Sequence, residues 1–358
     1  MMGRQHGKRI AAFVVCLTLL LSAGCSKVKE EDDRADQSRT KAETQERAGN
    51  TGTGGDEDRK EGKTLKQASV PQFIPNGIRS VSLTKDGEEF LHISREPAEY
   101  KMQFDYWEIL NPYDENATMN TEVMFEMFQE LCGITFEMPA EVLEGVDTGI
   151  EDSDMGYRVE YVDTLDDSVA KSTDEADTAA EVILGKEDGN GGRYAAVAGN
   201  EEQVYVLQEA ALQMIFGRKP FDYILKIPVL ISAETLEDIE ITADGSQFLI
   251  QVDAAKDSYR FGKKEVEKKE FAALYQLISG VGLVSEMEGE RSSGKDEPHL
   301  VVRFHRNMEG APDVSVCYYA FDDEFDSVEI DGVERFLVRK EDVEAVIGGI
   351  EENVFNYN

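Results

Sequence analysis

The 358-residue chain has little of what usually carries chemistry: 4 histidines, 4 cysteines and 1 tryptophan. So few cysteines exclude a disulfide framework, and none has the Cys-x-x-Cys spacing of a metal or redox site. Basic residues are also scarce, with 37 Lys and Arg against 73 Asp and Glu. A net charge of −36 disfavours nucleic acid and anionic lipid headgroups, because like charges repel. Solubility is the simple explanation of this acidity, and a cationic partner or bound cations is the alternative.

The chain begins with a basic stretch followed by an apolar segment, Ile10 to Leu21. This segment is 12 residues long, whereas a membrane-spanning helix needs about 20. Small residues and a cysteine follow directly, as Ser22-Ala23-Gly24-Cys25. A basic start, a short apolar core and small residues before a cleavage point predict that residues 1–24 are an export signal.

The end of this signal, Leu21 to Cys25, resembles the lipobox of bacterial lipoproteins, in which the cysteine is acylated and the chain is cut just before it. The resemblance implies that Cys25 is the lipidated mature N-terminus. The family usually has leucine where Ser22 stands, so an ordinary secretory signal that releases a soluble protein is the alternative. Two acyl chains hold a protein firmly at a membrane. We therefore expect a lipid-anchored protein on the extracytoplasmic face of the cell membrane.

Residues 25–68 predict a charged tether. Within it, residues 26 to 66 hold 11 acids and 10 bases and almost nothing large and apolar. Such a segment cannot bury enough surface to order itself, so we expect it to be disordered. Because its charges nearly cancel, the acidity of the chain belongs to the part that is expected to fold.

The remaining 290 residues are enough for two ordinary domains, which we expect at 69–230 and 231–358. Internal similarity favours two, since Val81 to Leu91 recurs as Ile239 to Leu249 at an offset of 158. Each copy has alternating apolar residues on both sides of Asp-Gly. This pattern predicts a tight β-hairpin, because Asp-Gly accepts the positive φ that the turn requires.

Apolar residues at i, i+3, i+4 and i+7 follow each hairpin and predict a helix. A third, shortened version around Asp331-Gly332 closes the chain. The pattern predicts an α+β fold of antiparallel sheets built from repeated Asp-Gly hairpins, with helices packed on one face, in two similar domains. The three helical stripes are Met124, Met127, Phe128 and Leu131; Phe271, Leu274, Tyr275 and Ile278; and Val343, Val346, Ile347 and Ile350. Further strands are expected at 157–162, 181–184, 194–197, 204–207, 300–304 and 314–319.

Two segments carry a resemblance to a known family. One is Tyr106-Trp-Glu-Ile-Leu-Asn-Pro112 with the helix that follows it, and the other is Ile183-Leu184-Gly185 with the strands to Val206. They resemble the bacterial domain-of-unknown-function family 4340 over roughly residues 75–280, although its usual Gly-Leu-x-x-Pro stretch is not recognisable between residues 147 and 180. The resemblance implies an extracytoplasmic protein, often a lipoprotein, associated with export-type ABC transporter components. It implies no established activity.

Motifs of known catalytic sites are missing: there is no G-x-S-x-G and no H-E-x-x-H. Beyond the signal the histidines are His92, His299 and His305. The last two are expected on one face of a strand, roughly 20 Å apart, which is too far for a shared metal. Cys132 and Cys317 could pair, but buried free thiols are favoured.

Acidic clusters at 322–326 and 151–154 supply the oxygen ligands that calcium takes, but they lack its usual loop. Residues 188–192 match that loop only in part. We favour solvated loops for the clusters and a hairpin turn for 188–192.

Trp107 could form a ligand-stacking surface with Tyr100, Phe104 and Tyr106. Core packing is favoured instead, because Trp107 and Ile109 alternate with a polar residue, as in a half-buried strand.

These observations favour a non-enzymatic interaction or accessory module, for example of an ABC-type exporter. A solute-binding lipoprotein and an extracellular hydrolase are the alternatives. We assign one site residue, the lipidated Cys25, and no catalytic residue, metal ligand or cofactor. The expected partners are the membrane, through that lipid, and envelope proteins such as transporter components.

Overall fold

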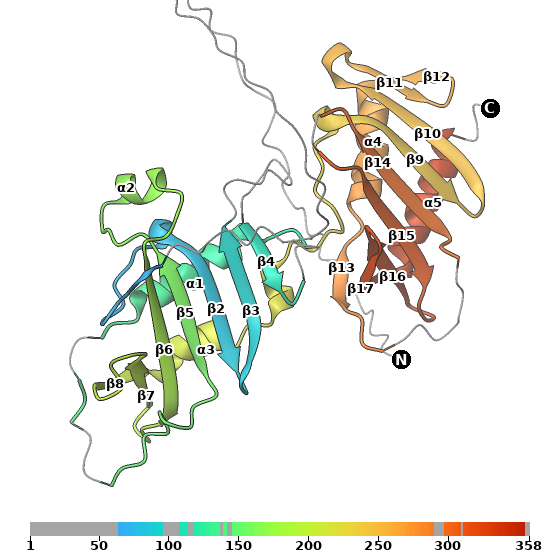
Figure 1. Cartoon of the computed structure of the whole chain (residues 1–358). Coiled ribbons are helices and arrows are strands. Elements are labelled where there is room, and N and C mark those ends of the chain that lie inside the picture. Colours follow the sequence, from blue (N-terminus) through green and yellow to red (C-terminus); the bar gives the residue numbers. More distant parts are fainter. Residues whose placement is uncertain are drawn as a thin grey trace, which may run out of the picture. The chain divides into compact units, whose positions relative to one another are not determined.

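The computed structural model describes residues 64–95, 107–113, 117–136, 139–141, 145–289, 297–308 and 311–354. These residues form two sheets, almost entirely antiparallel, and five α-helices, in agreement with the predicted α+β class (Figure 1). The signal, Cys25 and the tether up to residue 63 lie outside the described residues. Lys66 and Gln67, expected at the end of the tether, form a strand, so the first sheet begins before residue 69.

The first sheet has eight strands. They are β1 (Lys66–Gln67), β2 (Ile78–Lys85), β3 (Glu88–Arg95), β4 (Trp107–Asn111), β5 (Gly156–Tyr161), β6 (Thr178–Glu187), β7 (Gly192–Val197) and β8 (Val204–Gln208). Their order is β4-β3-β2-β5-β6-β7-β8, and β1 pairs in parallel with the start of β6. The helices of this half are α1 (Thr121–Gly133), α2 (Asp167–Ser172) and α3 (Glu209–Phe216).

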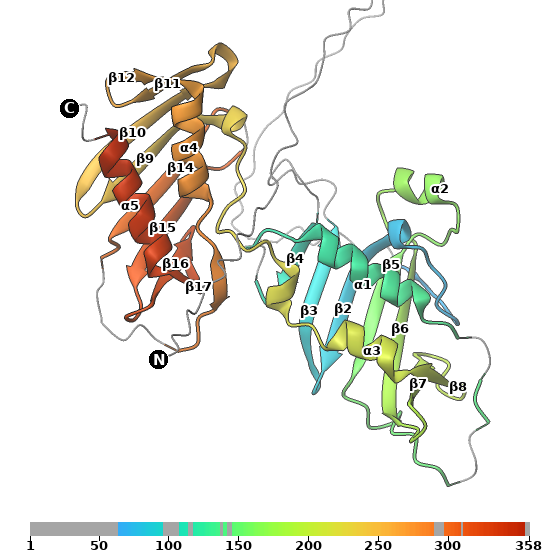
Figure 2. The same ribbon diagram turned by 180° about the vertical axis from the view of Figure 1, so that it is seen from behind.

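Two helices, α1 and α3, cover one face of the first sheet (Figure 2). Helix α1 begins at Asn120, whose side chain accepts a hydrogen bond from the N–H of Val123 and so caps the first turn. The predicted apolar stripe of α1 is buried, and it packs with the alternate core residues of β2. Helix α3 was not predicted, although its buried residues also recur at helical spacing; they are Leu212, Ile215 and Phe216.

The second sheet has nine strands. They are β9 (Leu236–Ala243), β10 (Ser246–Asp253), β11 (Ser258–Phe261), β12 (Lys264–Val266), β13 (Leu283–Glu286), β14 (Leu300–Arg306), β15 (Val314–Ala320), β16 (Phe325–Ile330) and β17 (Val333–Arg339). Their order is β12-β11-β10-β9-β14-β15-β16-β17-β13. Helices α4 (Lys268–Ser279) and α5 (Lys340–Val354) lie on one face of this sheet (Figures 1 and 2).

The two sheets share a strand order. In the first, β4-β3-β2-β5-β6-β7-β8 is followed in the chain by α3, and in the second, β11-β10-β9-β14-β15-β16-β17 is followed by α5. Helices α1 and α4 occupy equivalent places in the chain. Helix α1 comes before β5, the strand beside β2, and helix α4 comes before β14, the strand beside β9, with the short strand β13 between them. The third Asp-Gly stretch is therefore part of the second sheet, where β16, β17 and α5 correspond to β7, β8 and α3.

The Asp-Gly pairs lie at tight connections between neighbouring strands. Asp86 and Gly87 have φ of 55° and 76°, and Lys85 pairs with Glu88 on either side of them. Both residues are thus in the left-handed region, which glycine and aspartate tolerate better than other residues. Positive φ also occurs at the pairs between β9 and β10 and between β16 and β17, which are Asp244-Gly245 and Asp331-Gly332.

Candidate functional site

A cleft of about 250 Å³ lies at one end of the first sheet. It is formed by the short 3₁₀ turn Pro75–Gly77, the start of β2, the end of β3, the start of β4, and helices α1 and α2. Its walls combine cationic and aromatic side chains, which is unusual in so acidic a chain. The lining residues are Pro75, Asn76, Ile78, Arg79, Arg95, Trp107, Phe125 and Lys171.

Arg79 is buried in one wall of this cleft, with 6 % of its surface exposed. Its Nε lies 3.1 Å from the carbonyl oxygens of both Thr173 and Asp174. Its Nη1 donates to the carbonyls of Asn76 and Ile78, and its Nη2 to those of Ala170 and Thr173. Burial, and then the nearby Arg95, lower the pKa of Arg79.

This arrangement gives Arg79 a structural task. Its guanidinium fastens the turn before β2 to the last turn of α2, because five N–H donors meet main-chain carbonyls from both segments. All its partners are uncharged. Among the described residues no carboxylate lies within ion-pair distance of Arg79, although Asp174 lies near enough to act on its pKa in the opposite direction to burial.

The other two cations of the cleft have exposed acidic partners. Arg95 Nη2 lies 3.5 Å from Asp174 Oδ1, and Lys171 Nζ lies 2.6 Å from Asp167 Oδ2. The Arg95 side chain is 20 % exposed, but that of Asp174 is 68 % exposed. The hydrogen bonds from Lys171 and from Asn76 lower the pKa of Asp167. Asp174 therefore lies mainly toward solvent and Arg95 toward the cleft, whereas Lys171 and Asp167 are exposed to a similar degree.

Trp107 contributes to the core and to the cleft at once. Its ring centroid lies 5.1 Å from that of Phe128 on α1, and its backbone pairs with Arg95 at the end of β3. Packing against the core, which the alternating pattern favours, is thus confirmed, while the remaining surface of the ring lines the cleft. Tyr100, Phe104 and Tyr106 lie outside the described residues.

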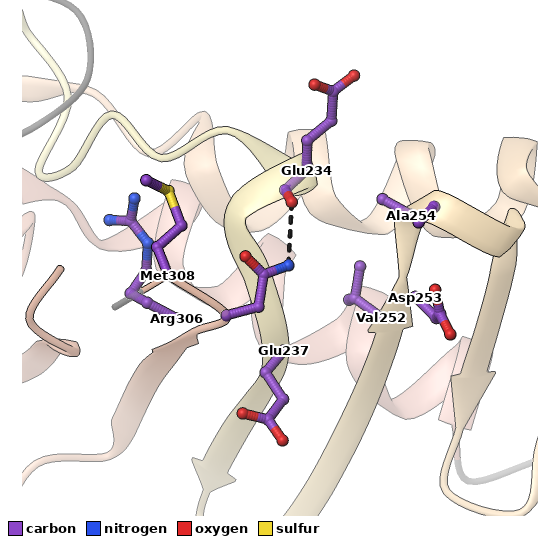
Figure 3. A pocket seen from close by; sticks show the side chains of 9 residues that line it. Glu234, Glu237, Val252, Asp253, Ala254, Arg306 and Met308 are labelled. Atoms are coloured by element: carbon purple, nitrogen blue, oxygen red, sulfur yellow. Dashed lines mark hydrogen bonds between the residues drawn. The ribbon is translucent and has the colours of Figure 1, made fainter. Parts of the chain in front are cut away.

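A second hollow, of about 610 Å³, lies beside the start of β9 in the second sheet. Its side chains do not converge. The carboxylates of Glu234, Glu237 and Asp253 point in different directions (Figure 3). The side-chain amide of Asn307 is used by the main chain, since it donates a hydrogen bond to the carbonyl oxygen of Glu234 at 3.0 Å (Figure 3). We find no common point in this hollow at which its acids could hold a ligand.

Sequence reasoning missed one cluster of functional groups. Ser80 Oγ lies 3.1 Å from His92 Nε2, and His92 Nδ1 lies 3.5 Å from Glu89 Oε1. The order serine, histidine, carboxylate is that of an acyl-transfer triad. However, β2 is a central strand paired with both β3 and β5, so its N–H groups are used by the sheet. A triad also needs free N–H donors for the developing oxyanion, and these strands do not supply them.

The two histidines of the second sheet have separate acidic partners. His299 Nε2 lies 3.0 Å from Asp326 Oδ2, and the Asp326 side chain is fully buried. His305 Nδ1 lies 2.8 Å from Asp313 Oδ2, and this hydrogen bond raises the pKa of His305. Asp238 and Glu240 lie on the other side of the His305 ring, at 3.9 Å and 3.6 Å from Nε2.

Cys132 and Cys317 are free thiols and are half-buried rather than fully buried. Burial raises the pKa of Cys132 to about 12 and also raises the pKa of Cys317. Raised pKa values disfavour the reactive thiolate. These thiols are therefore poor nucleophiles.

The acidic loops use their carboxylates to hold turns. Asp188 accepts hydrogen bonds from the N–H groups of Asn190 and Gly192, within the connection of β6 and β7. This confirms the predicted hairpin turn. Asp322 likewise accepts from the N–H groups of Glu324 and Phe325. Throughout the described residues, no group of three or more His, Cys, Asp or Glu side chains is arranged to hold a metal ion.

Comparisons with protein-family models, with curated proteins and with solved structures found no match to this chain. The resemblance to family 4340 therefore stays a prediction. No helix in the described part of the chain is long and apolar enough to cross a membrane.

Proposed function

We propose that the protein is a lipid-anchored, non-enzymatic interaction module of the bacterial envelope. In this proposal Cys25 carries the lipid, the following segment is a tether, and the folded part binds a membrane protein partner such as a component of an ABC-type exporter. The folded part consists of two similar domains built on Asp-Gly hairpins.

The common strand order of the two sheets supports this duplication. Both sheets place a hairpin and a third strand on one side of a four-stranded meander, with one helix before the meander and one after it. The chain offset between the two copies is the same in sequence and in structure, since β2 and β9 carry the residues that recur at 158. Duplication gives two comparable surfaces on one chain.

The observation that carries the proposal is the face of each sheet that lies opposite its helices, which we call the open face. On the first sheet Arg158 and Glu160 hydrogen-bond along β5, and Arg158 also reaches Glu181 on β6. On the second, Arg303 and Glu240 approach to 3.9 Å across β14 and β9. Charged side chains at alternate positions keep such a face soluble, and their pattern can be complemented by opposite charges on a partner.

Acidity and anchoring fit together in this proposal. An acidic folded part is repelled by an anionic membrane surface, while the lipid keeps it nearby. The folded part is then free to meet proteins that project from the membrane, and electrostatic complementarity favours a partner with a basic surface.

Site-specific photo-crosslinking in cells tests the partner. A photoreactive residue at Arg158, on the open face, is expected to crosslink a membrane-embedded transporter component. The same residue at Gln129, exposed on α1, is the matched control and is expected to crosslink it far less. Equal crosslinking from both positions, or from neither, would contradict an open-face interaction.

The anchor is tested separately with Cys25→Ala. The variant is expected to leave the membrane fraction and to lose labelling by a radioactive fatty acid. A variant that stays lipid-labelled would exclude Cys25 as the acylated residue. Cys132→Ala is the control, because Cys132 lies in α1 and is expected to leave labelling unchanged.

A further inference from the structure

We propose that the cleft between β3, β4, α1 and α2 binds a monoanionic ligand, a carboxylate carried on an aromatic or apolar group. This inference goes beyond the proposed interaction function and would stand if that function were wrong. It rests on the charge, the unused hydrogen-bond donors and the aromatic wall of the cleft.

Charge is the first argument. Arg79, Arg95 and Lys171 line the cleft, and Asp167 and Asp174 are the acids paired with them. Counted over the described residues, three cations against two carboxylates leave one positive charge at the cleft, in a chain of net charge −36. The buried guanidinium of Arg79 makes this surplus permanent, because an arginine side chain stays charged and its partners here are neutral carbonyls.

Unused donors are the second argument. Arg95 is four-fifths covered, yet among the described residues its side chain has a single ion-pair contact, at 3.5 Å to Asp174. A guanidinium has five N–H donors, and no Arg95 nitrogen is among the buried unpaired atoms of the described residues, so its remaining donors are open to solvent in the cleft. A carboxylate in the cleft would accept two of them side by side, in the bidentate geometry that arginine offers.

The opposite wall determines what the carboxylate is attached to. Trp107 and Phe125 line the cleft together with Pro75 and Ile78, so the part of the ligand away from Arg95 meets apolar surface. A flat ring can stack there on the exposed part of the indole. At about 250 Å³ the cleft is smaller than the roughly 300–1,000 Å³ of drug-sized sites, which favours a compact ligand.

Two sources offer this chemistry: a free aromatic carboxylic acid, and the C-terminal residue of a peptide. Trp107 is the only tryptophan of the chain, so its fluorescence reports on this cleft without added labels. The full-length protein in detergent is titrated with phenylacetate, and with phenylacetamide as the neutral control. A second pair is acetyl-Ala-Phe with a free C-terminus and the same peptide amidated.

We expect at least one of the two carboxylates to change the Trp107 fluorescence saturably, at least tenfold more tightly than its amide, and the affinity to fall as salt is added. Binding of phenylacetate indicates a small-molecule ligand, and binding of the peptide acid alone indicates a peptide C-terminus. Equal binding of acid and amide, or binding of neither acid, would overturn the proposal.

Variants locate the site. Arg95→Gln should weaken binding of the acid at least tenfold and leave the weak binding of the amide unchanged. Lys171→Gln, on a side chain that is 60 % exposed, should weaken it about two- to threefold. Arg158→Gln removes a cation of the same sheet outside the cleft and should leave the affinity unchanged. If Arg95→Gln unfolds the protein, Lys171→Gln still decides, since an unchanged affinity in that variant overturns the proposal.

Discussion

Arg79 and Thr173, 94 residues apart in the chain, are joined by two hydrogen bonds from the Arg79 guanidinium to one carbonyl oxygen. The guanidinium thereby ties the beginning of β2 to the end of α2. Replacing it removes donors from several covered carbonyls at once. The cost of each unsatisfied group is about 1–3 kcal/mol, reduced where water can enter.

We therefore expect Arg79→Met to lower the free energy of unfolding by about 2–4 kcal/mol, and Arg79→Lys to lower it less, because lysine keeps three donors. Urea denaturation followed by circular dichroism measures both. Arg158→Met is the control, since its side chain is 40 % exposed, and it should cost less than about 1 kcal/mol. If Arg79→Met lowered the free energy of unfolding no more than the control does, Arg79 would not be stabilising the fold by tying β2 to α2.

The backbone at Gly185 packs closely against the backbone at Thr148. A Cβ atom at this position would lie 2.2 Å from the carbonyl oxygen of Thr148, and main-chain atoms cannot move aside as a side chain can. We expect Gly185→Ala to lower the free energy of unfolding by about 1–3 kcal/mol. Gly133→Ala is a matched control, because nothing lies within 4 Å of the added carbon at the end of α1. That variant should be neutral or slightly stabilised, since alanine favours a helix. Thermal unfolding of both variants checks the pair, and equal melting temperatures would contradict the clash.

The pair of His305 and Asp313 predicts a pH dependence. The hydrogen bond to Asp313 raises the pKa of His305 above its ordinary 6.5, so protonated His305 stabilises the fold. This contribution is complete below pH 6.5 and is lost as the pH rises through the raised value. The pKa of Asp313 is lowered, by the N–H of Arg306 and then by His305, so its contribution is lost in acid, as the pH falls through that lowered value.

His305→Gln should therefore reduce the melting temperature more at pH 6 than at pH 8.5, since glutamine does not become charged. Asp238 and Glu240 also face the imidazole and act in the same direction on His305. Melting curves of the wild type and the variant across this range provide the measurement. A difference that stays constant with pH would show that the protonation of His305 does not contribute.

Local patterns in the sequence predicted much of the architecture. The stripe from Met124 to Leu131 matches the buried face of α1, because helical periodicity is a property of neighbouring residues. The expected strand at 157–162 matches β5, whose core residues alternate with polar ones. The Ser80–His92 contact could not be predicted in this way, because it depends on the register of two strands and on a bulge between them.

The cleft could not be predicted from the sequence for a related reason. Trp107 was considered as a stacking residue from the sequence, but Arg95 carries no motif, and the two become neighbours only when β3 and β4 pair. From the sequence alone Arg79 looks like an ordinary strand residue, because the carbonyl groups that it binds belong to a segment far away in the chain. Helix α2 lies in the segment between β5 and β6. It has only six residues, too few for a periodic apolar pattern to predict it. Spatial sites built from single residues of several elements leave no local signature.

Strand β1 has a mechanical consequence. It is attached to β6 by main-chain hydrogen bonds from Lys66 to Asp177, at 3.0 Å, and from Ala68 to Ala179, at 2.8 Å. For a chain held by a lipid at Cys25, as proposed, any pull from the membrane enters the fold at these bonds. If these bonds break first, the segment between β1 and β2 becomes available to extend before the strands of the sheet are loaded. Strand β1 would thus release before tension on the anchor acts on the central strands of the sheet.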